Sequence, residues 1–374
     1  MQHPVVVGPW ARPKTQPSRP TAQASFRNDK TGTMNINATD QAPKTVQGTD
    51  LPSPLGAMSV GQTEIRVKGK SVRVPSAQIH GRTVLVTGSW LEIAAVQDEE
   101  LMEGETVADP DSFVSQLMGS GLDADIFTFG QKMPDGTPKH TYHLEWDNFA
   151  IIPITTYAEW FEKRTESSVR RAVRKAAKQG IVVKVAEFDD EFVKGIVGIN
   201  NETPIRQGRE FWHFQKSFEA VKDENSTYPG RNEFLGAYYQ DELIGFMRII
   251  YAGKVASVVQ LLSLMKHYDK RPANAMIAKA VEVCEQKGIS YLMYCNYFYN
   301  DPSSSLTEFK RRNGFEQMVL PRYYIPLTLK GKIAIRLGLH RGLVHRIPKP
   351  IIRRLLQIRT SWYERRSKAA EGTL

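Results

Sequence analysis

The fold of this chain is decided by residues 233–264, which read EFLGAYYQDELIGFMRIIYAGKVASVVQLLSL. Three apolar runs in this stretch are separated only by two short breaks, QDE and AGK. Breaks this short leave no room for a crossover connection, so the strands that they join pair antiparallel. The stretch therefore predicts a three-stranded antiparallel meander.

The segments after the meander predict a crossover helix and a parallel strand. Residues 270–288 have Pro272 near their start and Gly288 at their end, and both are typical signals of helix boundaries. Residues 291–298, YLMYCNYF, are typical of a strand. Because strands joined by a helix in one sheet form a right-handed crossover, we expect residues 255–264 and 291–298 to be parallel neighbours. Two further elements follow, a helix at 303–314 and a strand at 315–327.

The residues before the meander predict a smaller set of strands and helices. Asp109 is a suitable N-cap, and Pro110 suits the first position of the helix that follows it. Alternating or β-branched residues predict strands at 63–74, 82–96, 124–129 and 148–154. A helix, a strand and a second helix are then expected at 166–180, 181–188 and 189–200. Residues 1–60 are rich in Pro, Gln, Thr and Ser with few large apolar groups, which predicts a disordered tail.

Composition excludes several classes of protein. The 374 residues are 41% hydrophobic and have a mean hydropathy of -0.39, which is typical of a water-soluble globular protein and not of a fibre. No run is long and apolar enough to predict a secretory signal or a membrane span. The two cysteines, Cys284 and Cys295, lack the spacing of metal ligands. We therefore expect no metal and a reducing, cytoplasmic location.

Positive charge is concentrated near the C-terminus. The net charge is +10, and residues 329–368 contain twelve Lys or Arg against one acid, Glu364. Leucine and isoleucine alternate with these cations, so residues 329–374 predict a basic amphipathic tail, and three interpretations remain open. The tail lies on an anionic membrane surface, captures RNA such as a tRNA, or packs its apolar side on the core and leaves the cations in solvent.

The order of these elements resembles the GNAT acyltransferase fold, and the segment EFKRRNGFEQ, residues 308–317, is its most telling local match. The segment RRAVRKAAKQGIVV, residues 170–183, together with the smaller set of elements before it, resembles the Fem-type peptidoglycan-bridge aminoacyl transferases. The resemblance implies an α+β fold with a mixed sheet and flanking helices. It divides the chain into a degenerate GNAT-like half at 61–165 and a GNAT-like acyltransferase domain at 166–328.

The same resemblance implies transfer of an acyl group from acyl-CoA or acetyl-CoA to an amine or hydroxyl, by direct attack in a ternary complex. The alternative is an aminoacyl-tRNA donor with a cell-envelope precursor as acceptor. A third possibility from another class is a GNAT-like module that binds nucleic acid or membrane without catalysis. The peripheral membrane location that the tail permits is compatible with the second and third.

Residues of the donor site follow from the expected parallel pair. A backbone N–H between Gln260 and Leu262 can donate to the donor's carbonyl, and the start of the next helix favours an anionic pyrophosphate. The helix-start residues concerned are Lys270, Arg271, Asn274 and Ala275. The loop HYDKRPANA has no glycine, unlike the acetyl-CoA loop of the GNAT family, and Pro272 removes one amide. The Fem-type branch commonly lacks that glycine loop too, so the donor stays open.

Residues of the acceptor site are predicted in NNETPIRQGREFWHF, residues 200–214. Glu202 and His213 are candidate general bases, and Arg206 and Arg209 suit a substrate carboxylate or phosphate. The structural alternative is that Glu202 pairs with an arginine and His213 packs among aromatic residues.

A second candidate segment for the acceptor site is NYFYNDPSSS, residues 296–305. It places Asn296 and Asn300 near the acceptor and Tyr299 as a candidate general acid toward the leaving group. The alternative is a plain strand end followed by a helix cap.

Overall fold

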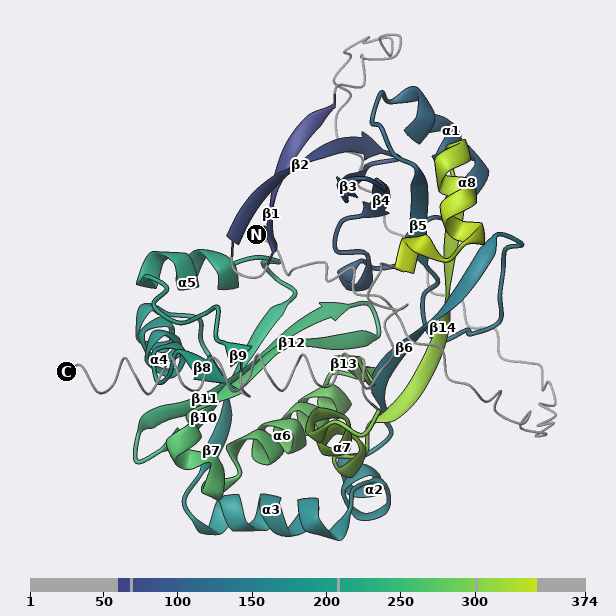
Figure 1. Ribbon diagram of the computed structural model, residues 1–374. Coiled ribbons are helices and arrows are strands. Elements are labelled where there is room, and N and C mark those ends of the chain that lie inside the picture. The colour runs from purple at the N-terminus through teal and green to yellow at the C-terminus, as the bar shows by residue number, and fades with distance from the viewer. Residues whose placement is uncertain (1–59, 68–69, 207–208, 300–301, 342–374) are drawn as a thin grey trace, which may run out of the picture. The chain divides into compact units, whose positions relative to one another are not determined.

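The computed structural model describes residues 60–67, 70–206, 209–299 and 302–341 (Figure 1). The expectations for residues 1–59 and for the greater part of the basic tail, 342–374, lie outside the described residues. The central feature is a mixed sheet of twelve strands with the order β1-β2-β3-β4-β5-β14-β6-β13-β12-β11-β10-β7. The expected α+β class, a mixed sheet with flanking helices, is confirmed.

The predicted meander forms as β10 (Asn232–Tyr239), β11 (Glu242–Ala252) and β12 (Val255–Ser263), all antiparallel. The first connection has Gln240 and Asp241 in left-handed backbone conformations, with φ of 50° and 64°. Two consecutive left-handed residues are typical of the type I′ turn, whose twist matches that of the two strands in a hairpin with a two-residue loop. The strand β7 (Val182–Ala186) pairs with β10 at the edge of the sheet.

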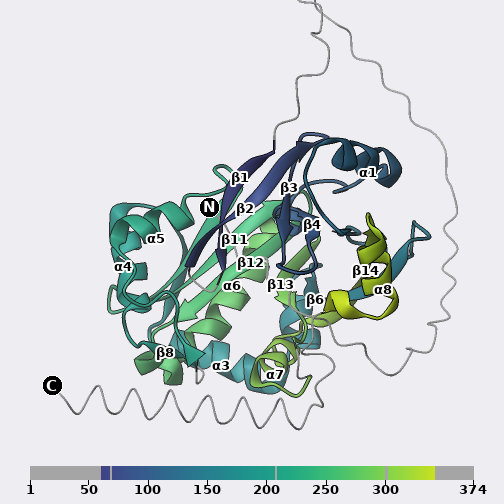
Figure 2. The same ribbon diagram turned by 45° about the horizontal axis from the view of Figure 1, so that its top comes forward.

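The predicted crossover forms as the helix α6 (Pro272–Gln286), which joins β12 to the parallel strand β13 (Tyr291–Asn296). One side of α6 buries Met276, Ala280, Val283 and Cys284 in the main hydrophobic core, as its spacing predicts. Figures 1 and 2 show α6 running along one face of β10 to β13. This packing fixes β12 and β13 relative to each other at the end where the helix connects them.

The N-terminal half repeats this plan on a smaller scale. Its strands are β1 (Gly61–Val67), β2 (Lys70–Ile79), β3 (Arg82–Thr87) and β4 (Ile93–Val96). Helix α1 (Pro110–Gly119) then leads to β5 (Ile126–Gly130), which is parallel to β4. The expected N-cap is confirmed, because the Asp109 carboxylate accepts hydrogen bonds from the backbone N–H groups of Asp111 and Ser112.

The last strands of the two halves are exchanged. Strand β6 (His143–Pro153) follows β5 in the chain but pairs antiparallel with β13, whereas β14 (Glu316–Pro326) follows β13 and pairs antiparallel with β5. The two exchanged strands also pair with each other over nine residue pairs, from Glu316–Ile151 to Tyr324–His143. The sheet is therefore continuous through both halves, while the sequence boundary between them near residue 165 stays a prediction.

The remaining elements flank the sheet (Figure 2). They are α2 (Tyr157–Glu159), η2 (Trp160–Arg164), α3 (Ser167–Lys178), α4 (Asp190–Asn200), α5 (Phe218–Asn225), α7 (Ser305–Arg312), α8 (Leu329–Arg336), the short turns η1 (Glu99–Leu101), η3 (Met265–Lys270) and η4 (Leu339–Arg341), and the hairpin strands β8 (Ile205–Arg206) and β9 (Arg209–Glu210). Helix α5 was not expected from the sequence. Within the described residues, no helix is long and apolar enough to cross a membrane.

The described start of the basic tail is helix α8. Its small residues Gly331 and Ala334 are buried against the N-terminal half, and the side chains of Leu329 and Ile333 are exposed. The inner side thus packs on the core, as one of the three interpretations of the tail requires. The two exposed apolar side chains leave the other two interpretations open.

Asn313 connects the helices that surround the parallel pair. Its side chain is fully buried, its Nδ2 donates to the Phe309 carbonyl at 2.7 Å, and its Oδ1 accepts from Asn274 of α6 at 3.0 Å. Gly314 follows with φ of 79°, which explains the pair NG at the end of α7, because a glycine adopts this left-handed conformation without steric cost.

Replacing Asn313 with alanine is expected to lower the free energy of unfolding by about 2 kcal/mol, because the buried Phe309 carbonyl and Asn274 amide lose their partner. Equilibrium denaturation in urea measures this. Asn201→Ala, at an exposed position that also accepts one hydrogen bond, is the matched control. A loss for Asn313→Ala no larger than that of the control contradicts the linking role.

Candidate functional site

The parallel strands β12 and β13 separate after three residue pairs. Among the described residues their ladder contains only Val255–Tyr291, Ala256–Leu292 and Ser257–Met293. Both strands bulge just beyond that point, because Val259 has no partner in β11, and Tyr294 and Cys295 together oppose one residue of β6. The splayed pair that the sequence predicted is present. We call the region between residues 258–260 and 294–296 the strand fork.

The thiol of Cys295 lies inside the strand fork. Cys295 has a left-handed backbone with φ of 47°, and its Sγ lies 3.8 Å from the carbonyl oxygen of Val258 on the opposite strand. Burial raises the pKa of this thiol, so it stays protonated and donates to the carbonyl. The thiol therefore closes the base of the fork and is a poor nucleophile.

A buried lysine faces the strand fork from helix α7. The Lys310 side chain is completely buried, and its ammonium group donates to the carbonyl of Asn296, the last residue of β13. Its Nζ also lies 4.6 Å from the centre of the Tyr294 ring and 5.4 Å from that of Tyr299. Among the described residues no carboxylate lies within ion-pair distance of it. Burial lowers the pKa of Lys310 to about 8, although Cys295 acts in the opposite direction.

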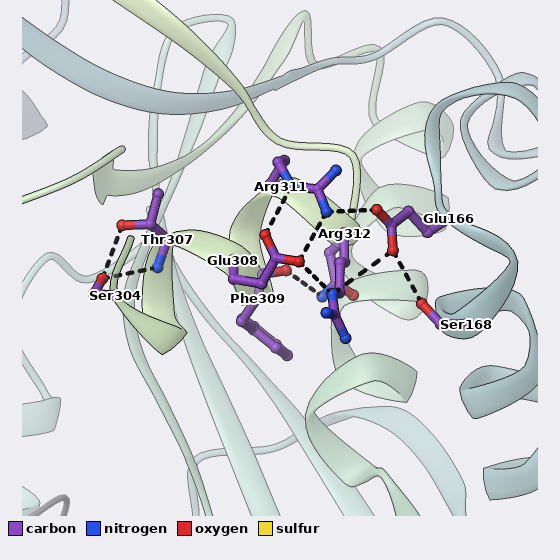
Figure 3. A network of polar contacts seen from close by, with 9 residues as sticks. Glu166, Ser168, Ser304, Thr307, Glu308, Phe309, Arg311 and Arg312 are labelled. Carbon is purple, nitrogen blue, oxygen red and sulfur yellow. Dashed lines mark hydrogen bonds and ion pairs between the residues drawn. The ribbon is translucent and has the colours of Figure 1, made fainter. Parts of the chain in front are cut away.

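Charged side chains on the outer side of helix α7 link this helix to α3. Figure 3 shows Arg311 and Arg312 between Glu308 of the same helix and Glu166 at the start of α3. Glu308 accepts hydrogen bonds of 2.7–2.8 Å from both arginines, and the backbone N–H of Glu166 donates to the Arg312 carbonyl at 3.0 Å. The outer side is thus anchored to α3 while the inner side carries the buried ammonium.

The residues predicted on and after the two strands lie in the strand fork or just beyond it. Gln260 follows the bulge of β12, and its buried Oε1 has no hydrogen-bond partner in the described part of the chain. Leu262 packs partly against the main core. Tyr299 follows the end of β13, where its side chain is 44% exposed. Partial burial and the nearby Cys295 raise the pKa of its hydroxyl, so Tyr299 is protonated at neutral pH.

The residues predicted at the start of α6 also lie together. Lys270 ends η3, and Arg271 is the N-cap of α6 but supplies no side-chain cap. Arg271 has φ of 62°, so this non-glycine residue adopts the left-handed conformation that glycine adopts without steric cost. The Asn274 side chain is bound to Asn313, and Ala275 packs on the core. The absence of a glycine therefore does not prevent the turn.

Glu202 and Arg206 hold each other and the end of β12. Their side chains form an ion pair of 3.1 Å, and Arg206 also donates to the carbonyls of Ile199 and Ser263. The Glu202 carboxylate accepts from the backbone N–H groups of Met265 and Lys266 at 2.7 and 2.9 Å, and so caps η3. These contacts favour the structural interpretation of the pair, because they use the groups that a substrate would need. A catalytic or binding role for the two residues stays a prediction.

His213 lies in the aromatic surroundings that the structural alternative described. Its ring centre is 3.6 Å from that of Trp212 and 5.3 Å from that of Phe211, and its side chain is buried beside Lys216 and Glu224. The prediction that His213 is a base is not tested by these contacts. The Arg209 side chain and Asn300 lie outside the described residues.

A cavity of about 530 Å³ lies on the sheet face opposite α6. Ala150, Leu292 and Ala256 pack in the core with α6, so the alternate residues of these strands face the other way. Phe149, Met293 and Val255 are among those alternate residues, and all three line the cavity. The cavity is therefore next to the strand fork but is reached from the other side of the sheet.

The cavity is lined by more acidic than basic residues. Five acids line it (Glu99, Glu100, Glu103, Glu105 and Asp147), against three bases (Lys132, Lys254 and Arg322). Arg322 is placed between two of the acids, with its Nε donating to Asp147 at 2.6 Å and a second nitrogen donating to Glu99. The second oxygen of Asp147, Oδ1, is buried without a hydrogen-bond partner in the described residues. An excess of carboxylates and an unpartnered oxygen suit a cationic ligand.

Glu100 is the carboxyl group of the cavity that is best suited to proton transfer. Desolvation by the surrounding protein and the negative charge of Glu99 raise the pKa of Glu100 to about 7. The Glu100 side chain is exposed toward the cavity, where water favours the charged carboxylate, so its pKa does not exceed about 7. Glu100 lines the cavity together with Met293, the last residue of β13 that pairs with β12 before the strand fork.

Sequence reasoning missed Lys310, Glu100 and Asn148. Lys310 was not singled out, although Leu306, Phe309 and Asn313 already define an inner side of the predicted helix that includes it. Asn148 of β6 holds the end of β13, since its backbone and side-chain oxygens accept from Tyr297 and Phe298. Glu100 lies in the short turn η1, which contacts β5 in one half and β11 in the other, and no local sequence pattern marks it.

The strand order, the crossover helix and the splayed parallel pair define a GNAT-like fold with a degenerate second copy. No protein-family model matches the sequence, and no curated protein matches it either. Among solved structures, the chain is similar to FemX, with 13% identity over 75% of this chain and 90% of FemX and a TM-score of 0.47.

Two other solved structures show the range of similarity. One is the C-terminal domain of a putative lysylphosphatidylglycerol synthetase from Agrobacterium fabrum, with 13% identity, coverage of 70% of this chain and 86% of that one, and a TM-score of 0.46. Another is the PaiA N-acetyltransferase of Thermoplasma acidophilum in complex with coenzyme A, with 18% identity, coverage of 38% and 99%, and a TM-score of 0.30. The assignment of the fold rests on the strand order and not on these similarities.

Proposed function

We propose that this protein is an acyltransferase that joins an activated acyl group to a primary amine. The observation that carries the proposal is Lys310, a fully buried ammonium without a carboxylate partner in the described residues, at the point where β12 and β13 separate. A buried, unpaired cation is costly unless a negative charge forms beside it. The oxygen of an acyl group under attack acquires that charge, and a fixed cation stabilises it.

The reaction consists of one direct attack and three proton transfers. The acceptor enters the acidic cavity as an ammonium ion, and the Glu100 carboxylate takes one of its protons. The neutral amine attacks the acyl carbonyl in the strand fork, and Lys310 stabilises the oxyanion. Collapse of the tetrahedral intermediate forms the amide and breaks the bond to the leaving group, which takes a proton from the Tyr299 hydroxyl. The resulting Tyr299 phenolate takes the second proton that the attacking nitrogen must lose, so the amide is neutral and the tyrosine is restored. We assign the base to Glu100 rather than to Glu202, because Glu202 already caps η3 and pairs with Arg206.

The residues at the start of α6 support acyl-CoA as the donor. The unpaired N–H groups of a fifteen-residue helix and the cations Lys270 and Arg271 favour a pyrophosphate there. The same charges also suit the phosphates of an aminoacyl-tRNA, so the experiment must separate the two donors. A cytoplasmic location fits either donor, since both are made in that compartment.

The donor is tested by thermal melting and by turnover. We expect 1 mM acetyl-CoA to raise the melting temperature, because a ligand that binds only the native state stabilises it. We also expect release of the CoA thiol when aliphatic amines, amino acids or amino sugars are added. Arg271→Gly, which keeps the left-handed turn but removes the charge, should weaken the CoA effect by at least about threefold.

The alternative outcomes identify the other hypotheses. Aminoacyl transfer from charged tRNA, with no effect of acetyl-CoA, replaces the donor and leaves the amine acceptor in place. Binding of tRNA or anionic vesicles with turnover from neither donor contradicts the enzymatic proposal and supports a binding module.

A further inference from the structure

A cluster of two histidines and a glutamate lies away from the strand fork and the acidic cavity. His143 and Glu145 begin β6, and His340 comes from the short turn η4 after α8. One ligand atom of each residue lies within 4.8 Å of the other two. His340 is almost 200 positions from the other two residues in the chain, so the fold brings the three together.

The geometry of the cluster is close to that of a metal site. Nε2 of His340 lies 2.8 Å from Oε1 of Glu145, and Nε2 of His143 lies 3.5 Å from the same oxygen. Ligands about 2.0–2.2 Å from a tetrahedral zinc ion are about 3.4 Å apart. Small rotations of the side chains would thus give all three atoms a common centre.

The burial of the cluster also points to a ligand. The His340 side chain is 1% exposed and that of Glu145 is 9% exposed. Nε2 of His143 is a buried atom without a hydrogen-bond partner among the described residues, although it faces the glutamate. Tyr324 packs against both imidazole rings, with ring centres at 4.8 and 6.1 Å, and limits their rotation. A buried nitrogen that faces a carboxylate and makes no bond is a group for which a ligand is expected.

We propose that His143, Glu145 and His340 bind a divalent transition metal, with zinc as the preferred ion. Two imidazoles and one carboxylate are a donor set of zinc sites that keep a fourth position for water. The ion would connect the first turn after α8 to the exchanged strand β6. This proposal is independent of the acyl-transfer proposal.

Arg341 is the residue that competes with the metal. Its Nε donates to Oε1 of Glu145 at 2.6 Å, so in the absence of an ion the guanidinium supplies the positive charge. The Arg341 side chain is 25% exposed and can move toward solvent. If the cluster binds a metal, removing this cation strengthens binding. If it is only an ion-paired contact, removing the cation has no effect on metal binding.

The test uses the full chain without an affinity tag, freed of metal by chelation and then dialysed against zinc. We expect about one zinc per chain after gel filtration, measured by atomic emission, and a tetrahedral absorption spectrum when cobalt replaces zinc. His143→Ala should weaken zinc binding by at least about tenfold, because loss of a ligand exceeds the loss of an outer partner. Arg341→Gln should tighten it several-fold.

His80→Ala, which removes an exposed histidine of the same half, is the matched control and should not change zinc binding. His143 is used for the main variant because the Glu145–His340 hydrogen bond remains in it, so the protein keeps that contact. Failure of the unsubstituted protein to retain zinc, or equal zinc affinity of the unsubstituted and His143→Ala proteins, overturns the proposal. Equal affinity in Arg341→Gln assigns the cluster to ion pairing alone and overturns it too.

Discussion

Turnover of the Lys310→Met variant is expected to be about 10²- to 10³-fold lower than that of the unsubstituted protein, which is the usual cost of losing one oxyanion donor. Methionine has a similar length and volume but no charge, so the strand fork keeps its shape. The measurement is release of the CoA thiol, or aminoacyl transfer if charged tRNA is the donor, at saturating acceptor. The loss should appear in kcat and in kcat/KM alike, because the oxyanion exists only after the attack.

The same variant should not be less stable. Lys310 is fully buried, and its folded pKa of about 8 is below its ordinary value of 10.5. The unfolded chain therefore binds more protons between about pH 8 and 10.5, so stability rises with pH in this window as the burial cost is relieved. That cost is on the order of 3 kcal/mol below pH 8. We expect Lys310→Met to remove the rise and to leave the free energy of unfolding at pH 7 unchanged or higher.

The control is Arg312→Gln, which removes a cation from the exposed side of the same helix. It should retain nearly full turnover. If Lys310→Met is active, or if it unfolds more easily and loses activity in proportion, Lys310 is a packing residue and not an oxyanion donor.

The part of the fold that depends on local pattern was predictable from the sequence. The meander, the helix that begins at Pro272 and the helix capped by Asp109 follow from turn chemistry and helix-start signals, which act within a few residues. The exchange of β6 and β14 was not predictable. Each strand has the same apolar pattern whichever half it joins, and only tertiary pairing decides the partner.

The candidate site was likewise predictable only in part. The splayed strands were inferred from the order of the elements. The residues predicted for the donor site lie at the end of η3 and in the first turn of α6, and their binding role stays a prediction. The acidic cavity was missed because its carboxylates come from η1, from the loop that follows η1, and from β6, which is distant from both in sequence. The segment 200–214 was predicted to form the acceptor site because it is polar. In the structure, Glu202 and Arg206 form hydrogen bonds with backbone groups of η3, α4 and β12, and no sequence pattern shows in advance that these groups need partners.

Replacing Glu100 with glutamine is expected to lower kcat/KM by about 10²- to 10⁴-fold at pH 7, the usual contribution of a general base. In the unsubstituted protein, kcat/KM should rise with pH as Glu100 loses its proton, with an apparent pKa of at most about 7. It should fall again above about pH 8, as Lys310 loses its proton. Glu100→Gln should abolish the acidic limb and keep the alkaline one, and Lys310→Met should do the reverse.

The matched control for Glu100 is Glu103→Gln, which removes one negative charge from the same cavity at an exposed position. If Glu100 acts only by attracting a cationic acceptor, both variants should raise KM to a similar degree and keep the acidic limb. If Glu100 takes the proton, only its own variant loses kcat and the limb together. Deprotonation of a free amine does not mimic this result, because an alkylamine with a pKa near 10.4 titrates well above the acidic limb. If the Glu100→Gln variant keeps the acidic limb of the pH profile, Glu100 is not the base, and Glu202 or His213 becomes the candidate again.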